Sequence, residues 1–128
     1  MATYLVTGAN RGIGYEYCLQ LQARGDSAIA VCRKASKELK ALGIQVEENI
    51  DVTSDDSVAN LHERLGETQI DVLINNAAIA KSITLEHLDF DSIREQFEVN
   101  ALGALRVTQV LLLWLKAGGK VESHGVNI

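Results

Sequence analysis

Proline is absent from the 128 residues, and Cys18 and Cys32 are the only cysteines. Without proline, no helix is broken by a missing backbone N–H. The cysteines fall in segments that we expect to be a helix and a buried strand, so we expect free thiols in a reducing cytoplasm rather than a disulfide. His62, His87 and His124 pair with no cysteine at a metal-ligand spacing, and no metal site is expected.

Positive charge and long apolar runs are also scarce. The chain has 12 Lys and Arg against 17 Asp and Glu, a formal net charge of -5, which argues against binding to nucleic acid. No stretch approaches the roughly 20 apolar residues of a membrane span, and residues 1–6 lack the basic start of a signal peptide. With 47% hydrophobic residues, we expect one globular, cytoplasmic domain over residues 1–128.

Strand and helix patterns alternate along the chain. The expected strands are 3–7, 27–32, 45–50 and 71–75, and the expected helices are 12–24, 36–42, 54–65 and 90–116. The second strand is apolar throughout its middle, as burial on both faces requires. Such alternation is typical of a parallel sheet between two helical layers. We therefore expect a doubly wound, three-layer α/β/α fold with about five strands in the order 3-2-1-4-5.

Three local signals suggest where the later elements begin and end. Thr53 and Asp56 are spaced like a capping box at the start of the third helix. The Gly118–Gly119 pair is expected to end the long helix. A fifth strand is expected from Val121, but residues 121–128 are too polar for burial on both faces, so they form either an edge strand or a frayed end.

Glycines gather where the first strand meets the first helix, in the sequence Thr-Gly-Ala-Asn-Arg-Gly-Ile-Gly at positions 7–14. Glycines at this turn allow a tight bend and close approach of the backbone to a pyrophosphate, which the free N–H groups of the helix can bind. The alternative is an ordinary glycine-rich turn, but its place in a strand-loop-helix unit favours a Rossmann-type nucleotide site. The residues expected to contact a cofactor here are Gly8, Asn10, Arg11, Gly12, Ile13 and Gly14.

The end of the second strand suggests which dinucleotide is bound. An acidic residue there normally binds the ribose 2′-hydroxyl of NAD, but residues 32–34 are Cys-Arg-Lys and Asp26 precedes the strand. A guanidinium suits a phosphate dianion, so Arg33, with Arg11 from the glycine loop, indicates NADP rather than NAD. The alternative is that Arg33 and the lysines after it form a solvated helix face.

The glycine spacing resembles the T-G-x-x-x-G-x-G loop of the short-chain dehydrogenase/reductases. Three further stretches resemble that family in order and spacing: Asp51-Val52 after the third strand, residues 75–78 (Asn-Asn-Ala-Ala) after the fourth, and Val99-Asn100 in the long helix. The resemblance covers about residues 3–120.

The resemblance implies specific roles for matching residues. Asp51 would accept a hydrogen bond from the adenine amino group, and Val52 would pack on the adenine ring. Asn75 would tie the fourth strand to its neighbours, and the Ala77 backbone would lie along the cofactor ribose. Asn100 would be the catalytic Asn, whose backbone carbonyl holds a water in the proton relay.

The family's other catalytic residues have no match in this chain. The family has a Ser after the fifth strand, then a Tyr and a Lys four residues apart, where the Lys lowers the Tyr pKa for proton exchange with the substrate oxygen. None of Tyr4, Tyr15 and Tyr17 is followed by Lys four residues later, and Ser123 lies too near Val121 to follow a completed strand. We therefore expect a cofactor-binding half without the C-terminal catalytic part.

Three functions follow as hypotheses. The first is an NADP(H)-binding domain of a reductase or dehydrogenase that acts on a small carbonyl or alcohol, and that does not catalyse the reaction alone. The second is a partner-binding or regulatory module without enzymatic activity. The third is an active reductase that is completed by another chain.

The long helix suggests self-association. Residues 110–115 are apolar on every side, whereas a helix that covers one face of a sheet needs only an apolar stripe. We expect a homo-oligomer through residues 90–116, because pairing of two such helices would bury apolar side chains that are otherwise exposed to water. Some of Val107, Val110, Leu111 and Trp114 are expected to stay exposed.

Overall fold

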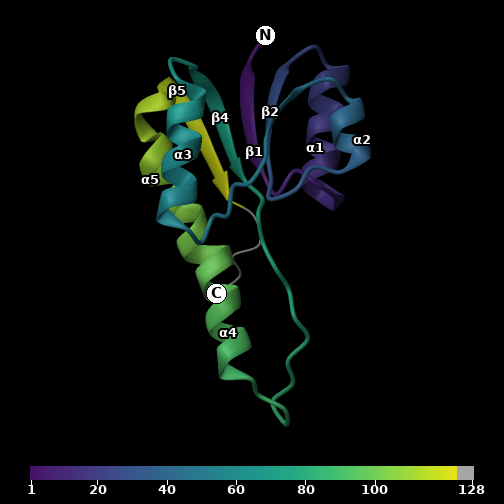
Figure 1. The fold of residues 1–128 in the computed structure, drawn as a ribbon, viewed down its shortest axis with the longest axis vertical. Coiled ribbons are helices and arrows are strands. Elements are labelled where there is room, and N and C mark those ends of the chain that lie inside the picture. Colours follow the sequence, from purple (N-terminus) through teal and green to yellow (C-terminus); the bar gives the residue numbers. More distant parts are fainter. Residues whose placement is uncertain (124–128) are drawn as a thin grey trace.

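The computed structural model describes residues 1–123 as a five-stranded parallel sheet between helical layers, with strand order β3-β2-β1-β4-β5 (Figure 1). The strands are β1 (Thr3–Thr7), β2 (Ser27–Val31), β3 (Gln45–Glu47), β4 (Ile70–Asn75) and β5 (Leu115–Ser123). The helices are α1 (Gly12–Ala23), α2 (Lys37–Ala41), α3 (Asp55–Leu65), α4 (Phe90–Phe97) and α5 (Ala104–Leu111). The predicted doubly wound fold and strand order are confirmed.

Each face of the sheet has its own apolar core (Figure 1). On β1, Leu5 faces the layer of α3 and α5, and Val6 faces the layer of α1 and α2. Both side chains are fully buried, which explains why the strand is apolar at successive positions rather than alternate ones. Cys18 on α1 and Cys32 after β2 are free and buried in the second core.

After β1 the chain forms β2 and β3 on one side of β1. After β3 it crosses to the other side of β1, where it forms β4 and β5. β1 pairs with β2 on one side and with β4 on the other, so the strand order reverses between β1 and β4. In open α/β sheets, this reversal leaves a crevice beyond the carboxyl ends of the strands. The candidate site lies there.

The helix predicted over residues 90–116 is shorter and less regular than expected. A π-helical segment, η1 (Glu98–Gly103), joins α4 to α5, and a 3-10 turn, η2 (Leu112–Trp114), follows α5. Together these four elements, residues 90–114, form one helical column. Below the sheet, α4 and the loop before it project together away from the body of the molecule (Figure 1).

The prediction that Gly118 and Gly119 end the helix is wrong, because both lie within β5. Leu115 pairs with Ile70 and Lys120 with Val72, so β5 bulges against β4. A Cβ on Gly119 would lie 2.9 Å from the Lys116 carbonyl oxygen and 3.0 Å from the Asp71 carbonyl oxygen, so a larger residue there would require the bulge to shift. β5 is an edge strand, as one alternative held, but it begins six residues before Val121, and positions 124–128 of the predicted tail lie outside the described residues.

The predicted capping box at Thr53 and Asp56 is also wrong. Ser54 caps α3 by accepting the Ser57 N–H at 3.2 Å, while the Thr53 side chain donates to Asp51 instead. The cap therefore falls one residue later than the pattern indicated.

Some of four side chains on the long helix were expected to stay exposed, and two of the four are fully buried. Val107 and Leu111 pack in the core beside α3, because α5 turns this face to the sheet. Val110 and Trp114 are partly buried, and the Trp114 indole N–H donates to the Gly66 carbonyl oxygen at 2.8 Å. The large apolar side chains that are exposed along this column are others: Phe90, Ile93, Phe97, Leu102, Leu105, Leu112 and Leu113.

Candidate functional site

A cavity of about 760 Å³ opens at the carboxyl ends of β1, β2 and β4. Most of the residues predicted from the sequence to bind a cofactor line it: Gly8, Asn10, Arg11, Gly12, Arg33, Asp51, Val52 and Ala77. Its lining residues do not include Ile13, Gly14, Asn75 or Asn100.

The glycine loop brings α1 close to β4. A Cβ on Gly14 would lie 2.2 Å from the Gly8 carbonyl oxygen and 2.6 Å from the Asn76 side-chain nitrogen, so only glycine fits. Gly12 has a φ of +57°, and a Cβ there would meet nothing within 4 Å. Gly14 therefore serves packing, whereas Gly12 leaves its backbone open to the cavity.

The backbone N–H groups in the first turn of α1 are not capped by a side chain. Its N-cap, Arg11, makes no side-chain hydrogen bond to the helix, and the first turn has no acidic residue. By contrast, Ser36, Ser54 and Asp89 each accept a backbone N–H at the start of α2, α3 and α4. Uncapped N–H groups and the positive end of the helix dipole face the cavity at α1, an arrangement suited to an anion such as a pyrophosphate. The glycine loop and the first turn of α1 therefore fit the pyrophosphate of a dinucleotide.

The loop after β2 is held against the glycine loop. The Asn10 side-chain oxygen accepts the Ser36 N–H at 2.6 Å, and the Ser36 hydroxyl donates to the Asn10 carbonyl oxygen at 3.1 Å. Arg11 and Arg33 are exposed on these two loops and form no ion pair with any of residues 1–123. Two unpaired guanidinium groups therefore flank the same end of the cavity.

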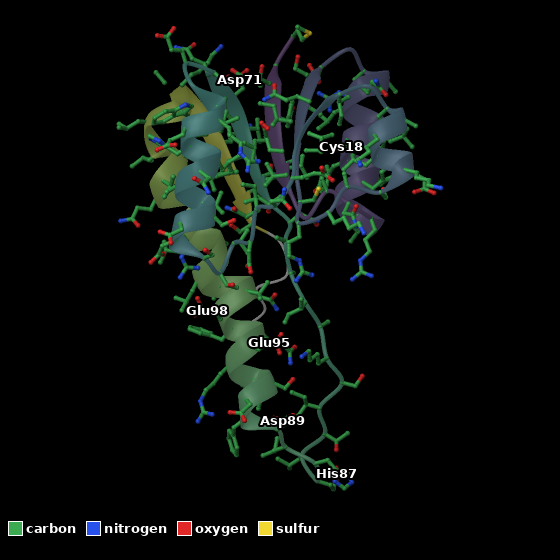
Figure 2. All side chains as sticks on the ribbon, viewed as in Figure 1. Cys18, Asp71, His87, Asp89, Glu95 and Glu98 are labelled. Carbon is green, nitrogen blue, oxygen red and sulfur yellow. The ribbon has the colours of Figure 1, made fainter. Side chains whose placement is uncertain are left out.

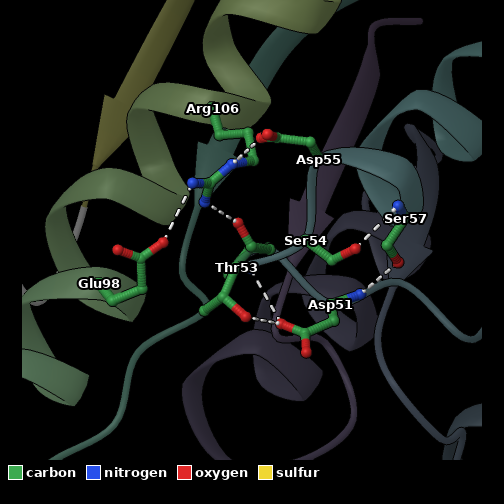
Figure 3. A network of polar contacts seen from close by, with 8 residues as sticks. Asp51, Thr53, Ser54, Asp55, Ser57, Glu98 and Arg106 are labelled. Atoms are coloured by element: carbon green, nitrogen blue, oxygen red, sulfur yellow. Dashed lines mark hydrogen bonds and ion pairs between the residues drawn. The ribbon is translucent and has the colours of Figure 1, made fainter.

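Asp51 also lines the cavity, from the loop between β3 and α3, and Arg33 is near enough to act on its charge (Figure 3). Its carboxylate accepts the Thr53 hydroxyl at 2.7 Å and the Thr53 N–H at 2.9 Å, and these bonds lower the pKa of Asp51. Its own N–H donates to the Ser57 hydroxyl at 2.7 Å. The carboxylate is therefore ionised and fixed at neutral pH.

Arg106 on α5 binds this same loop (Figure 3). Its guanidinium donates to the Val52 carbonyl oxygen at 2.6 Å, to Asp55 at 2.6 Å and to Glu98 at 3.0 Å. The sequence prediction missed Arg106, although one signal was present, since it is the only charged residue between positions 99 and 115.

The end of β4 is tied to β1 by a hydroxyl. The buried Thr7 hydroxyl accepts the N–H groups of Asn76 and Ala77, each at 3.0 Å. The Asn76 side chain donates to the Gly8 carbonyl oxygen at 3.2 Å. Thr7 and Asn76 belong to the sequence motifs but were not predicted as site residues, and their hydrogen bonds hold the ends of β1 and β4 together.

Asn75 points away from the cavity. Its amide donates to the Thr108 hydroxyl at 3.0 Å and to the Ser123 hydroxyl at 3.4 Å, so it contacts α5 and β5. Its side-chain oxygen is buried and has no partner among the residues described.

Asn100 holds the loop after β4 against the helical column. In η1, its amide group donates to the Ile79 carbonyl oxygen and accepts the Ile79 N–H, both at 2.8 Å. Two residues further, the Lys81 N–H donates to the Gln96 side chain at 3.2 Å, and the Lys81 ammonium pairs with Glu95 on α4 (Figure 2). One backbone segment is thus fastened to the helix at two points.

The cavity carries few groups for proton transfer. No tyrosine is among the residues that line it, and burial raises the pKa of the Cys32 thiol, which therefore stays protonated at neutral pH. Within residues 1–123, no group of three or more His, Cys, Asp or Glu could hold a metal ion, and no helix is long and apolar enough to span a bilayer.

The family model for short chain dehydrogenases matches residues 2–123. The chain is 40% identical over 123 residues to 1-hydroxy-2-glutathionyl-2-methyl-3-butene dehydrogenase of Rhodococcus sp., covering 94% of this chain and 54% of that protein. It is 31% identical to the NADPH-dependent 3-dehydrocapnine reductase of Ornithobacterium rhinotracheale, covering 94% of this chain and 46% of that protein. The chain thus spans about half the length of these relatives.

A solved structure agrees with the sequence comparisons. A carbonyl reductase from Pseudomonas aeruginosa in complex with NADP superposes with a TM-score of 0.85 at 31% identity, covering 94% of this chain and 59% of that one.

Proposed function

Because the chain belongs to the short-chain dehydrogenase family, whose members are oxidoreductases that use NAD(P), we propose that it binds NADP(H) in preference to NAD(H). The observation that carries the proposal is the pair of unpaired guanidinium groups, Arg11 and Arg33, beside a strand end without a carboxylate. A 2′-phosphate would be paired there with two guanidinium groups. The NADP complex of the Pseudomonas carbonyl reductase and the name of the Ornithobacterium enzyme support this preference.

The cavity suggests how the chain would hold the nucleotide. The pyrophosphate would rest on the uncapped N–H groups of α1 around Gly12, and the adenine between Asp51 and Val52. The backbone at Ala77 would lie along the second ribose. When bound, NADP(H) supplies or accepts a hydride, and the chain's own residues bind it and orient it.

The substrate class is proposed from the family and the relatives. We infer a small carbonyl or alcohol, since the relatives named above are a dehydrogenase and two reductases. Asn100 is proposed to hold a water of the proton relay through its backbone carbonyl, while its side chain binds the Ile79 backbone. The two free thiols support a reducing compartment such as the cytoplasm.

Exposed apolar side chains along α4 and α5 favour a second element of the proposal, a homo-oligomer. Phe97, Leu105 and Leu113 are exposed on this column, and Leu113 is 88% exposed. Monomers rarely leave such a column uncovered, and a second copy would cover it.

A titration of the 128-residue chain with NADPH and NADH tests cofactor choice. We expect NADPH to bind at least tenfold more tightly, because the net contribution of hydrogen bonds to charged groups is about 1.5–3 kcal/mol. Arg33→Asp should remove the preference by weakening NADPH and sparing NADH. The matched control is Lys37→Asp, which makes the same charge change on α2 outside the cavity lining. Equal affinities for the two cofactors in the unmodified chain would contradict the proposal.

A further inference from the structure

We propose that Arg106 is a positioning residue that sets the adenine side of the cavity, and that one helical column thereby holds two walls of the nucleotide site. The inference rests on the proposed function, because the nucleotide is what the Asp51–Val52 wall is proposed to bind.

The contacts of Arg106 join the stretch from Val52 to Asp55 to the helical column (Figure 3). Its three nitrogen atoms donate to Val52 in the loop after β3, to Asp55 in the first turn of α3, and to Glu98 at the start of η1. The side chain is only 19% exposed. A guanidinium is planar with donors at fixed angles, so three simultaneous bonds fix the relative positions of all three partners.

Val52 is held from a second side by the same column. A Cβ on Gly103 would lie 2.7 Å from Val52 Cγ2, so the backbone of η1 packs directly on that side chain. Gly103 precedes Arg106 by one helical turn, which places both contacts on one face. The helix therefore fixes the Val52 side chain by packing and its carbonyl by a charged hydrogen bond.

The column also holds a second part of the cavity wall. Asn100 lies between Glu98 and Gly103 in η1 and binds the backbone of Ile79, which lines the cavity beyond Ala77. Arg106 and Asn100 thus fasten the two walls of the site, Val52 and Ile79, to one rigid helix. The spacing of these walls depends on this helix rather than on the sheet alone.

Ligands that fill one end of the site test the assignment. We would measure dissociation constants of the 128-residue chain for NADPH, for 2′,5′-ADP and for reduced nicotinamide mononucleotide. Arg106→Gln should weaken NADPH and 2′,5′-ADP about tenfold, the equivalent of losing one hydrogen bond to a charged group, and leave the mononucleotide within about twofold. Arg106→Lys should restore part of the loss, since it keeps the charge without the planar fork. The control is Arg94→Gln, because Arg94 pairs on the exposed surface with Asp91.

Hydrogen exchange of the nucleotide-free chain supplies a readout that does not depend on binding. We expect faster exchange of the backbone N–H groups around residues 51–55 in Arg106→Gln than in Arg94→Gln. If Arg106→Gln fails to fold, Arg106→Lys carries both measurements.

Three results would overturn the assignment: unchanged affinity for 2′,5′-ADP in Arg106→Gln, an equal loss for the mononucleotide, or unchanged exchange around residues 51–55. If the unmodified chain binds no nucleotide, the proposed function fails, and the role in nucleotide binding fails with it. If it binds NADPH and the variant binds equally well, only the role of Arg106 fails.

Discussion

The Cys18 thiol is fully buried between α1 and the sheet. Burial, with a smaller contribution from Cys32, raises the pKa of Cys18 from 9.0 to about 11. Folding thus raises the pKa of an acid that is neutral when protonated. The resulting stabilisation is complete below the unfolded pKa of 9.0 and is lost as the pH rises through the folded value.

We therefore expect Cys18→Ala to flatten the alkaline part of the stability profile. Between about pH 9 and 11, the free energy of unfolding of the unmodified chain should fall more steeply than that of the variant, by at most about 1.4 kcal/mol per pH unit. Urea titrations of both proteins at pH 7, 9, 10 and 11 measure this difference. Parallel profiles would show that the thiol does not titrate with unfolding.

At the scale of single residues, the sequence could identify those that act through a local pattern. Gly12, Arg33 and Asp51 stand in motifs with fixed spacing, and the structure places all three on one cavity. Arg106 could not be found in that way, because its partners Val52 and Asp55 are about 50 residues away in the chain. A lone charge in an apolar helix indicates a buried partner but does not name it.

At the scale of elements, the glycine loop and α1 depend on close packing at Gly14. A Cβ there would lie 2.2 Å from a backbone oxygen, so Gly14→Ala must displace the helix from the loop. We expect it to lower the free energy of unfolding by about 3 kcal/mol, the upper range for overpacking.

Gly25→Ala is the matched control for this change. Gly25 has a φ of +85° and open space around it, so alanine there meets only the cost of the left-handed conformation, about 1 kcal/mol. Chemical denaturation of the two variants gives both values. Equal losses would mean that the loop adjusts and that the close contact is not what requires glycine.

Local sequence patterns predicted the bounds of most helices and strands to within a few residues. They failed where pairing with a strand that is distant in the sequence determines the secondary structure. Leu115 continues an apolar run that favours a helix, yet it pairs with Ile70 and begins β5. Gly118 and Gly119 have the composition of a helix stop and instead allow a bulge against β4. The hydrogen bonds of an adjacent strand outweigh the weak local preference of each residue.

At the scale of the whole molecule, the exposed column of α4 and α5 predicts self-association. Light scattering at micromolar concentration should give a dimer or a larger species, and Leu105→Lys should shift it toward the monomer by placing a charge on the column. Leu85→Lys is the control, since Leu85 is also exposed but lies in the loop before α4. A monomer at every concentration, for the unmodified chain, would refute this prediction.

We expect no NADPH-dependent carbonyl reduction by the purified 128-residue chain. The cavity lining has no tyrosine, and removing a positioned proton donor typically lowers a rate by about 10²–10⁴. The measurement is NADPH oxidation, followed by absorbance, with small aldehydes and ketones as substrates. Turnover that persists through purification to homogeneity would reveal an acid elsewhere in the chain or in a second copy.

The central position of β1 has a consequence for folding during synthesis. β1 is made first, and β2 can pair with it after about 24 residues, but its other neighbour is β4, whose Asp71 accepts the Thr3 N–H across a separation of 68 residues. Until β4 leaves the ribosome, the strand at the centre of the sheet has one unsatisfied edge and one uncovered apolar flank. Closing this long loop is slow because its entropy is lost before any contact forms, so we infer that the nascent chain is most prone to aggregate between the emergence of β2 and that of β4.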